Sequence, residues 1–228
     1  ERQSPRRITW APSSARPGVA SEGAMVKLLF SGIYTQPSGG GDPILLTSSS
    51  QLSSFGYFQR GSMLEMCTFF GRQFSKAAQP GTRSSIKHED YLCHVYSTPH
   101  GVNALTFSDH EYPARVAFGY LAQLVDDFIK AAGAQIPAQP SEGCMNAAFK
   151  ARHDEMLLKF QDPAEADQLT SIMRQLDETK LILHETIETA IERGQKLDTL
   201  IEKSNELSGS SKMFYRTARK QNQCCKLM

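Results

Sequence analysis

Residues 169–200 read LTSIMRQLDETKLILHETIETAIERGQKLDTL, and apolar side chains recur through this stretch at alternating steps of three and four residues. The same stepping continues to residue 218. The fifteen positions of this seam are Leu169, Ile172, Leu176, Thr179, Leu183, Thr186, Ala190, Arg193, Leu197, Leu200, Ser204, Leu207, Ser211, Phe214 and Ala218. Ten of the fifteen are apolar. A heptad repeat of this kind, roughly seven heptads long, predicts a long coiled-coil helix across residues 164–221.

Arg193 is the one charged residue in the seam. An unpaired buried charge costs several kcal/mol, so a guanidinium at this position requires partner helices that supply hydrogen-bond acceptors. The small polar positions, such as Thr179 and Ser204, would pack poorly in a self-dimer. The pattern therefore predicts a helix built for assembly with other chains, and one that is partly disordered until they bind.

The composition limits what else the chain does. It has 228 residues, of which 40% are hydrophobic, and a formal net charge of +1. This leaves room for one compact domain plus an extended segment, and it does not predict nucleic-acid binding. No run approaches the roughly 20 apolar residues of a membrane-spanning helix, so we expect any membrane attachment to be covalent or peripheral. The cysteines have no spacing typical of secreted disulfide scaffolds, which indicates a reducing compartment. They are Cys67, Cys93, Cys144, Cys224 and Cys225.

The first part of the chain has a different pattern. Residues 1–24, rich in Ser, Pro, Arg, Ala and Gly, are expected to form a disordered extension. Residues 25–139 then show strand-type runs at 26–34, 44–46, 82–87, 91–96 and 102–107, and helical periodicity at 54–78 and 113–133. This order predicts an α+β domain with an antiparallel sheet and packed helices. Two prolines, Pro137 and Pro140, indicate a linker over 140–163 that contains a short helix near 146–160.

The last residues, 222–228, form a separate tail. Cys225 begins a four-residue pattern of cysteine, two middle residues and Met228, which is typical of farnesylation. Cys224 is placed for a second lipid, most simply a palmitoyl group. One short lipid gives marginal membrane binding, whereas two hold firmly. Lys226 departs from the usual pattern, because the first middle residue is ordinarily apolar or small. Basic residues such as Arg216 and Arg219 would add attraction to anionic lipid.

Catalytic and nucleotide-binding motifs are absent from the sequence. Three consecutive glycines, Gly39 to Gly41, are followed by Asp42 and Pro43, which offer neither the lysine nor the hydroxyl of a phosphate-binding loop. There is no Gly-x-Ser-x-Gly elbow, and the six histidines lack metal-ligand spacing. We therefore expect no enzymatic activity, no metal, no cofactor and no small-molecule substrate.

Several short motifs are specific enough to suggest a family. They are Leu176–Lys180 (LDETK), Glu192–Leu197 (ERGQKL), Lys212–Tyr215 (KMFY), the closing cysteine pair, Phe58–Arg60 (FQR), Tyr91–Tyr96 (YLCHVY) and Glu111–Pro113 (EYP). With them, nearly everything after Met25 resembles the Ykt-type longin-domain R-SNAREs, which are prenylated, synaptobrevin-like v-SNAREs. The resemblance implies a longin (profilin-like) domain with a five-stranded antiparallel sheet, followed by the long SNARE helix.

The resemblance also implies roles for individual residues. Arg193 would form the central layer of a parallel four-helix bundle with glutamines from three Q-SNARE helices (Qa, Qb and Qc). The longin domain would fold back on its own SNARE segment and shield the lipid, with Phe69 at the contact. The protein would act in ER–Golgi, intra-Golgi and endosomal or vacuolar transport. It would divide between a cytoplasmic pool and the cytosolic face of those membranes.

Two alternatives stay open from the residues alone. Phe69 has the helical periodicity of an ordinary core residue, and periodicity by itself favours that role. Arg193 could instead bend or solvate a coiled coil that recruits a partner without driving fusion. The protein would then be a prenylated tether or trafficking adaptor. A tether should dock vesicles without merging them, so a lipid-mixing assay separates the two functions.

Overall fold

The structure is a computed structural model of the 228-residue chain, and it describes residues 28–37, 40–88, 91–164, 180–184, 186–191 and 196–225. For Lys180 and residues 220–225 it describes the backbone alone. The expected disordered extension, residues 1–24, lies outside the described residues.

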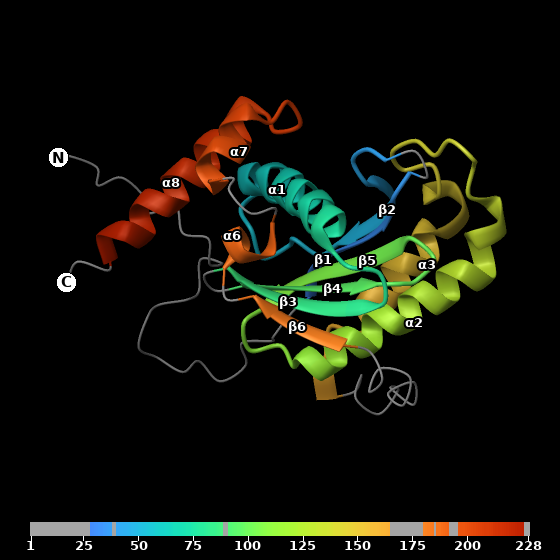
Figure 1. The fold of residues 1–228 in the computed structure, drawn as a ribbon. Helices are drawn as coiled ribbons and strands as arrows, with labels where there is room; N and C mark the ends of the chain where they lie inside the picture. Colours follow the sequence, from blue (N-terminus) through green and yellow to red (C-terminus); the bar gives the residue numbers. More distant parts are fainter. Residues whose placement is uncertain are drawn as a thin grey trace.

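A central sheet organises the fold (Figure 1). Its first five strands are β1 (Leu28–Thr35), β2 (Ile44–Ser50), β3 (Thr82–His88), β4 (Tyr91–Ser97) and β5 (Val102–Asp109). They pair antiparallel in the spatial order β2-β1-β5-β4-β3. The five-stranded antiparallel sheet expected from the sequence is therefore confirmed.

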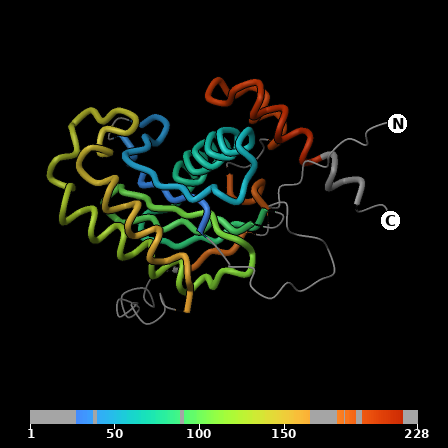
Figure 2. The backbone as a smooth tube through the Cα atoms, turned by 180° about the vertical axis from the view of Figure 1, so that it is seen from behind, coloured from blue at the N-terminus to red at the C-terminus, as the bar shows by residue number. Residues whose placement is uncertain are grey.

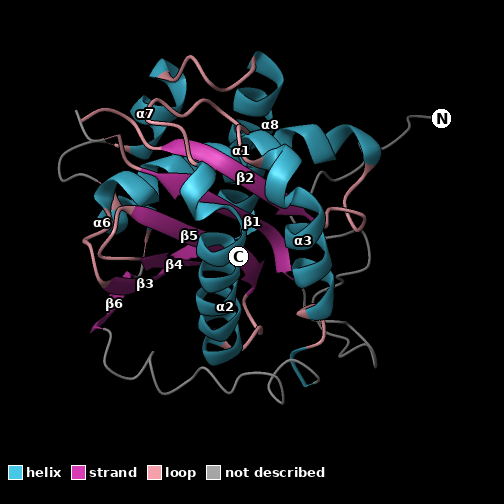
Figure 3. Cartoon of the chain, turned by 90° about the vertical axis from the view of Figure 1, so that its right-hand side faces the viewer, coloured by secondary structure: helices cyan, strands magenta, loops and turns pink. Residues whose placement is uncertain are grey.

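Helices cover both faces of this sheet. One face carries α1 (Tyr57–Ala77), and the other carries α2 (Ala114–Ala132) and α3 (Asn146–Lys159), with the short helix η1 (Gly133–Gln135) after α2 (Figure 3). Residues next to each other in a strand point to opposite faces, so the sheet supplies two cores. Tyr34 and Leu45 pack with α1, whereas their neighbours Ile33 and Leu46 pack with α2 and α3. The α+β architecture predicted from the sequence is confirmed.

The segment expected to be a linker with a short helix, residues 140–163, contains α3, which packs against the first domain. Buried side chains of this segment, including Phe149 and Leu157, join the core beneath α2. The loop before α3 also completes the edge of β2, where the Gly143 N–H donates to the Leu45 carbonyl at 2.8 Å. Two prolines suggested a boundary, but the apolar face of α3 packs on the sheet and on α2.

The segment expected to be one long helix has a different form in the described residues. It contains a strand, β6 (Lys180–His184), and three helices, α6 (Ile187–Ala190), α7 (Leu197–Lys203) and α8 (Gly209–Cys225). The strand pairs parallel with β3 and makes the sheet six-stranded. Viewed from behind, α2 and α3 cover one side of the sheet, and α7 and α8 lie beside α1 on the other (Figure 2). An amphipathic segment without partner helices must bury its apolar face elsewhere, and α1 supplies that surface.

Candidate functional site

The contact between the predicted coiled-coil segment and the first domain begins at β6. Its register runs from Lys180 opposite Thr82 to His184 opposite Ile86. β6 covers the edge of β3. Backbone pairing with β3 therefore stabilises β6 more than burial of the β6 side chains does. Leu183, a predicted seam residue, is 72% exposed in this arrangement.

Helix α6 closes an apolar cavity of the first domain. The Thr186 hydroxyl caps this helix by accepting the Thr189 N–H at 3.3 Å. Ile187, the first residue of the capped helix, lines this cavity together with Met63 and Cys67 of α1. Burial raises the pKa of the Cys67 thiol to about 12, so this cysteine is protonated and unreactive near neutral pH.

Polar contacts fix the turn before α8 to α1. The Ser208 N–H donates to the Glu65 carboxylate at 2.9 Å, and Arg72 pairs with Glu206 at 2.5 Å. Burial by itself would raise the pKa of Glu65, but hydrogen bonds from Ser208 and Ser211 outweigh it and lower the pKa. Arg72 also pairs with Glu142 at 2.8 Å, so a single guanidinium joins α1, the loop before α3 and the segment before α8.

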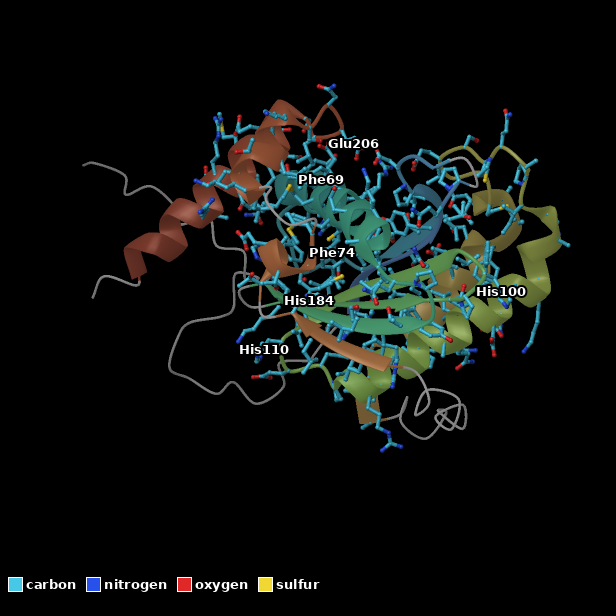
Figure 4. The ribbon with its side chains drawn as sticks, in the orientation of Figure 1. Phe69, Phe74, His100, His110, His184 and Glu206 are labelled. Atoms are coloured by element: carbon cyan, nitrogen blue, oxygen red, sulfur yellow. The ribbon has the colours of Figure 1, made fainter. Side chains whose placement is uncertain are left out.

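Phe69 lies between these two polar contacts on the same face of α1. It follows Glu65 by four residues and precedes Arg72 by three, spacings that place side chains on one side of a helix. Its side chain is 3% exposed. In Figure 4, Phe69 lies on the part of α1 toward α7 and α8, whereas Phe74 of the same helix lies nearer the sheet. Phe69 belongs to the same apolar cluster as Leu207 and Tyr215 of the folded-back segment.

Half of the ten described seam residues are buried in this intramolecular contact. Five are buried: Ala190, Leu197, Leu207, Ser211 and Ala218. Leu200, Ser204 and Phe214 are partly buried, whereas Leu183 and Thr186 are exposed. Leu169, Ile172, Leu176, Thr179 and Arg193 lie outside the described residues. Cys224 and Cys225 fall in the last turn of α8, for which only the backbone is described.

Helices α7 and α8 form a hairpin held by ion pairs. Arg216 pairs with Glu202 at 2.5 Å, and Arg219 pairs with Asp198. The Lys212 ammonium donates to the Glu202 backbone carbonyl at 2.9 Å. The heptad pattern gave no indication of these contacts, because they depend on a reversal of the chain between residues 203 and 209.

The sequence pattern also did not predict the contacts made by Glu65 and Arg72. Their separation of seven residues, two turns of α1, was a weak indication of a shared face. Their partners in the folded-back segment, Ser208 and Glu206, are more than a hundred residues away along the chain, which no local pattern reveals.

A buried serine–histidine contact in the other core resembles part of a catalytic site. His153 Nε2 contacts the Ser31 hydroxyl, which also contacts the Tyr120 hydroxyl at 2.7 Å. Ser31, His153 and Tyr120 are each 0% exposed, so no substrate reaches them. Burial lowers the pKa of His153 to about 3, which keeps the ring neutral. The group joins β1, α2 and α3 and is structural.

Neither a clustered metal site nor a membrane-spanning helix is present in the described part of the chain. No cluster of three or more His, Cys, Asp or Glu residues that could hold a metal ion occurs there. None of the helices in the described ranges is both long and apolar enough to cross a bilayer.

Comparisons with known proteins agree with this division of the chain. Residues 52–152 match the longin family, described as a regulated-SNARE-like domain, and residues 168–227 match the synaptobrevin family. The VAMP-like protein YKT61 of Arabidopsis thaliana is 44% identical over 82% of this chain and 92% of its own length. The synaptobrevin homolog YKT6 of Saccharomyces cerevisiae is 37% identical over 89% of this chain and 100% of its own length. The chain belongs to the Ykt6 family of longin-domain R-SNAREs, which are trafficking proteins and not enzymes.

Proposed function

We propose that the chain assembles with three Q-SNARE helices into a parallel four-helix bundle that docks and fuses vesicles, and that its longin domain inhibits this step. The supporting observation is that seam residues such as Leu197, Leu207 and Ala218 are buried within the chain itself. The same side chains cannot face α1 and three partner helices at once. The folded-back form is therefore a closed state that competes with assembly.

The backbone supports the same conclusion. A four-helix bundle needs a continuous helix through residues 180–218, whereas here residues 180–184 are extended and the chain reverses between α7 and α8. A strand rises about 3.3 Å per residue and a helix about 1.5 Å, so β6 cannot join the bundle helix without leaving β3. Opening therefore requires release of β6, α6 and the α7–α8 hairpin.

Arg193 is the proposed central layer of the assembled bundle. Its guanidinium has five fixed N–H donors, which suit three glutamine side-chain carbonyls in a seam shielded from water. Such a layer fixes the register of the four helices even where it adds little net stability. The three partners are proposed to be one helix each of the Qa, Qb and Qc classes.

The membrane anchor is proposed to be covalent. A farnesyl group on Cys225 and a second lipid, most simply palmitoyl, on Cys224 would hold the protein firmly, whereas one chain would leave it exchangeable. In the closed state the longin domain is proposed to shield the lipid and maintain a cytoplasmic pool. The lipidated open form would act on the cytosolic face of Golgi, ER-derived, endosomal or vacuolar membranes. A mass spectrum of the native C-terminal peptide tests both lipids.

Assembly is tested with the full chain and three purified Q-SNARE helices. We expect a heat-stable four-component complex, which Arg193→Ala weakens and Arg193→Gln weakens less because the side chain keeps donors. Phe69→Ala should speed assembly without changing the melting temperature of the finished complex. If wild type and Phe69→Ala form no complex with any Q-SNARE set, the proposal is wrong.

A second measurement, on lipidated protein, distinguishes membrane fusion from the function of a tether or adaptor. Reconstituted vesicles that carry the chain and its three partners should mix their lipids, and the Arg193→Ala variant should slow mixing. Docking of vesicles without lipid mixing would favour the tether.

A further inference from the structure

Helix α8 carries a row of basic residues along one face. Lys212, Arg216 and Arg219 are separated by four and three residues, so they lie on the same side of the helix. We call these three residues the basic stripe. All three contact α7 through the bonds described above.

The opposing acidic residues of α7 are matched to this stripe. Asp198 and Glu202 are four residues apart, one helical turn, and each pairs with one arginine of the stripe. The side chains of Arg216 and Arg219 remain 61% and 41% exposed. The two carboxylates therefore neutralise the stripe electrostatically more than they bury it.

These ion pairs exist only in the hairpin. If α7 and α8 become one continuous helix, Glu202 and Arg216 are fourteen residues apart and Asp198 and Arg219 are twenty-one apart. At 1.5 Å per residue these separations are about 21 Å and about 32 Å, well beyond the Debye length of about 8 Å at physiological salt. Opening of the closed state thus removes the counter-charges.

Assembly of the bundle does not use the stripe. The seam positions in this region are Ser211, Phe214 and Ala218. The residues of the basic stripe fall on the outer heptad positions, which point away from partner helices. Arg219 precedes the cysteine pair by five and six residues, about 8–9 Å along a helix axis. A positively charged face therefore lies beside the proposed lipid anchor in the open form.

We propose that the basic stripe is a binding surface for anionic lipid, that Asp198 and Glu202 mask it in the closed state, and that opening exposes it to the bilayer. The inference rests on the proposed closed and open states. It adds that opening raises the affinity for negatively charged membranes independently of the lipid anchor. A cation near an anionic bilayer contributes about 1 kcal/mol, which is about fivefold in partitioning.

The test uses the full chain with Cys224→Ser and Cys225→Ser, so that no lipid contributes. Partitioning is measured by flotation with vesicles of phosphatidylcholine alone and of phosphatidylcholine containing about one third phosphatidylserine. The Asp198→Asn, Glu202→Gln variant should bind the anionic vesicles about five- to twenty-five-fold more than its parent, equivalent to one or two released cations. Adding Arg216→Gln and Arg219→Gln should return binding to the parent level. Both effects should disappear at about 0.5 M NaCl.

A matched control separates this surface from a general change in charge. Asp127 and Glu155 pair with the exposed Arg152 on the opposite side of the sheet. Asp127→Asn, Glu155→Gln raises the net charge by the same two units and should leave vesicle binding near the parent level. Equal gains in both double variants would overturn the proposal. The proposal would also be overturned if the Asp198→Asn, Glu202→Gln variant bound neutral vesicles as strongly as anionic ones. It would equally be overturned if this variant gained no binding to either kind of vesicle. Assembly with Q-SNARE helices, measured on the same proteins, tests the proposed function separately.

Discussion

Phe69 gives the sharpest test of whether α1 holds the folded-back segment. The side chain is 3% exposed and lies between Glu65 and Arg72, both of which bond to residues 206–208. Truncation to alanine should remove about 2–3 kcal/mol of apolar burial. If that burial forms only on closure, Phe69→Ala raises the open population about 30- to 150-fold, since each 1.4 kcal/mol is tenfold.

The assay is amide hydrogen exchange of the full chain, read by mass spectrometry. Amides of β6 and α8 should exchange faster by the same 30- to 150-fold, about 2–3 kcal/mol, because they are protected only while the segment is folded back. Amides of β1, β4 and β5 should keep their protection, because the sheet does not open with the segment.

Phe74→Ala is the matched control on the same helix. Phe74 is 2% exposed and lies 6.4 Å from Phe107 of β5, measured between ring centroids. Its truncation should cost the domain about 3–5 kcal/mol and reduce protection throughout the sheet. If Phe69→Ala instead behaves like Phe74→Ala, with β6 and α8 affected no more than the sheet, Phe69 is an ordinary core residue and the reasoning fails.

Three further outcomes follow from the structure. Arg72→Ala and Glu206→Ala should each speed amide hydrogen exchange in α8. In a double-mutant cycle the two substitutions should show a coupling energy of up to about 1 kcal/mol. Additive effects would show that the ion pair does not hold the turn before α8. Because the folded-state pKa of His153 is about 3, below its unfolded value, acid favours the unfolded chain. Protonation of this histidine alone should lower the free energy of unfolding, measured by urea denaturation, by about 2 kcal/mol between about pH 7.5 and pH 5. His153→Gln should remove that share of the pH dependence. Gly71→Ala would place a methyl 2.4 Å from a buried tyrosine hydroxyl and should cost about 1–3 kcal/mol, whereas Gly61→Ala, with open space around it, should be neutral or stabilising in the same titration.

The sheet and the helices α1 and α2 could be predicted because their patterns are local. A short apolar run interrupted by Ser31 and Gly32 defines β1, and helical spacing of phenylalanines defines α1. The sequence pattern predicted the helix α3, but it did not predict that α3 packs against the first domain. Periodicity shows that a helix has an apolar face without showing which surface covers that face.

The form of the coiled-coil segment depends on context. Residues 180–184, Lys-Leu-Ile-Leu-His, fit a heptad helix and a strand equally well, and the free edge of β3 decides between them here. Arg193 and the cysteine pair were identified by motif, and their roles stay predictions. Glu65, Arg72, Asp198 and Glu202 act through contacts that exist only after the chain folds back on itself.

The parallel pairing of β6 with β3 has a consequence for how long the open form survives. When β6 leaves, the backbone N–H and C=O groups on the outer side of β3 lose their partners. A bare strand edge of this kind is a template for association with other chains. The open protein would therefore be prone to aggregate at high concentration, and rapid capture by its cognate helices or swift reclosure would protect the cell from that outcome.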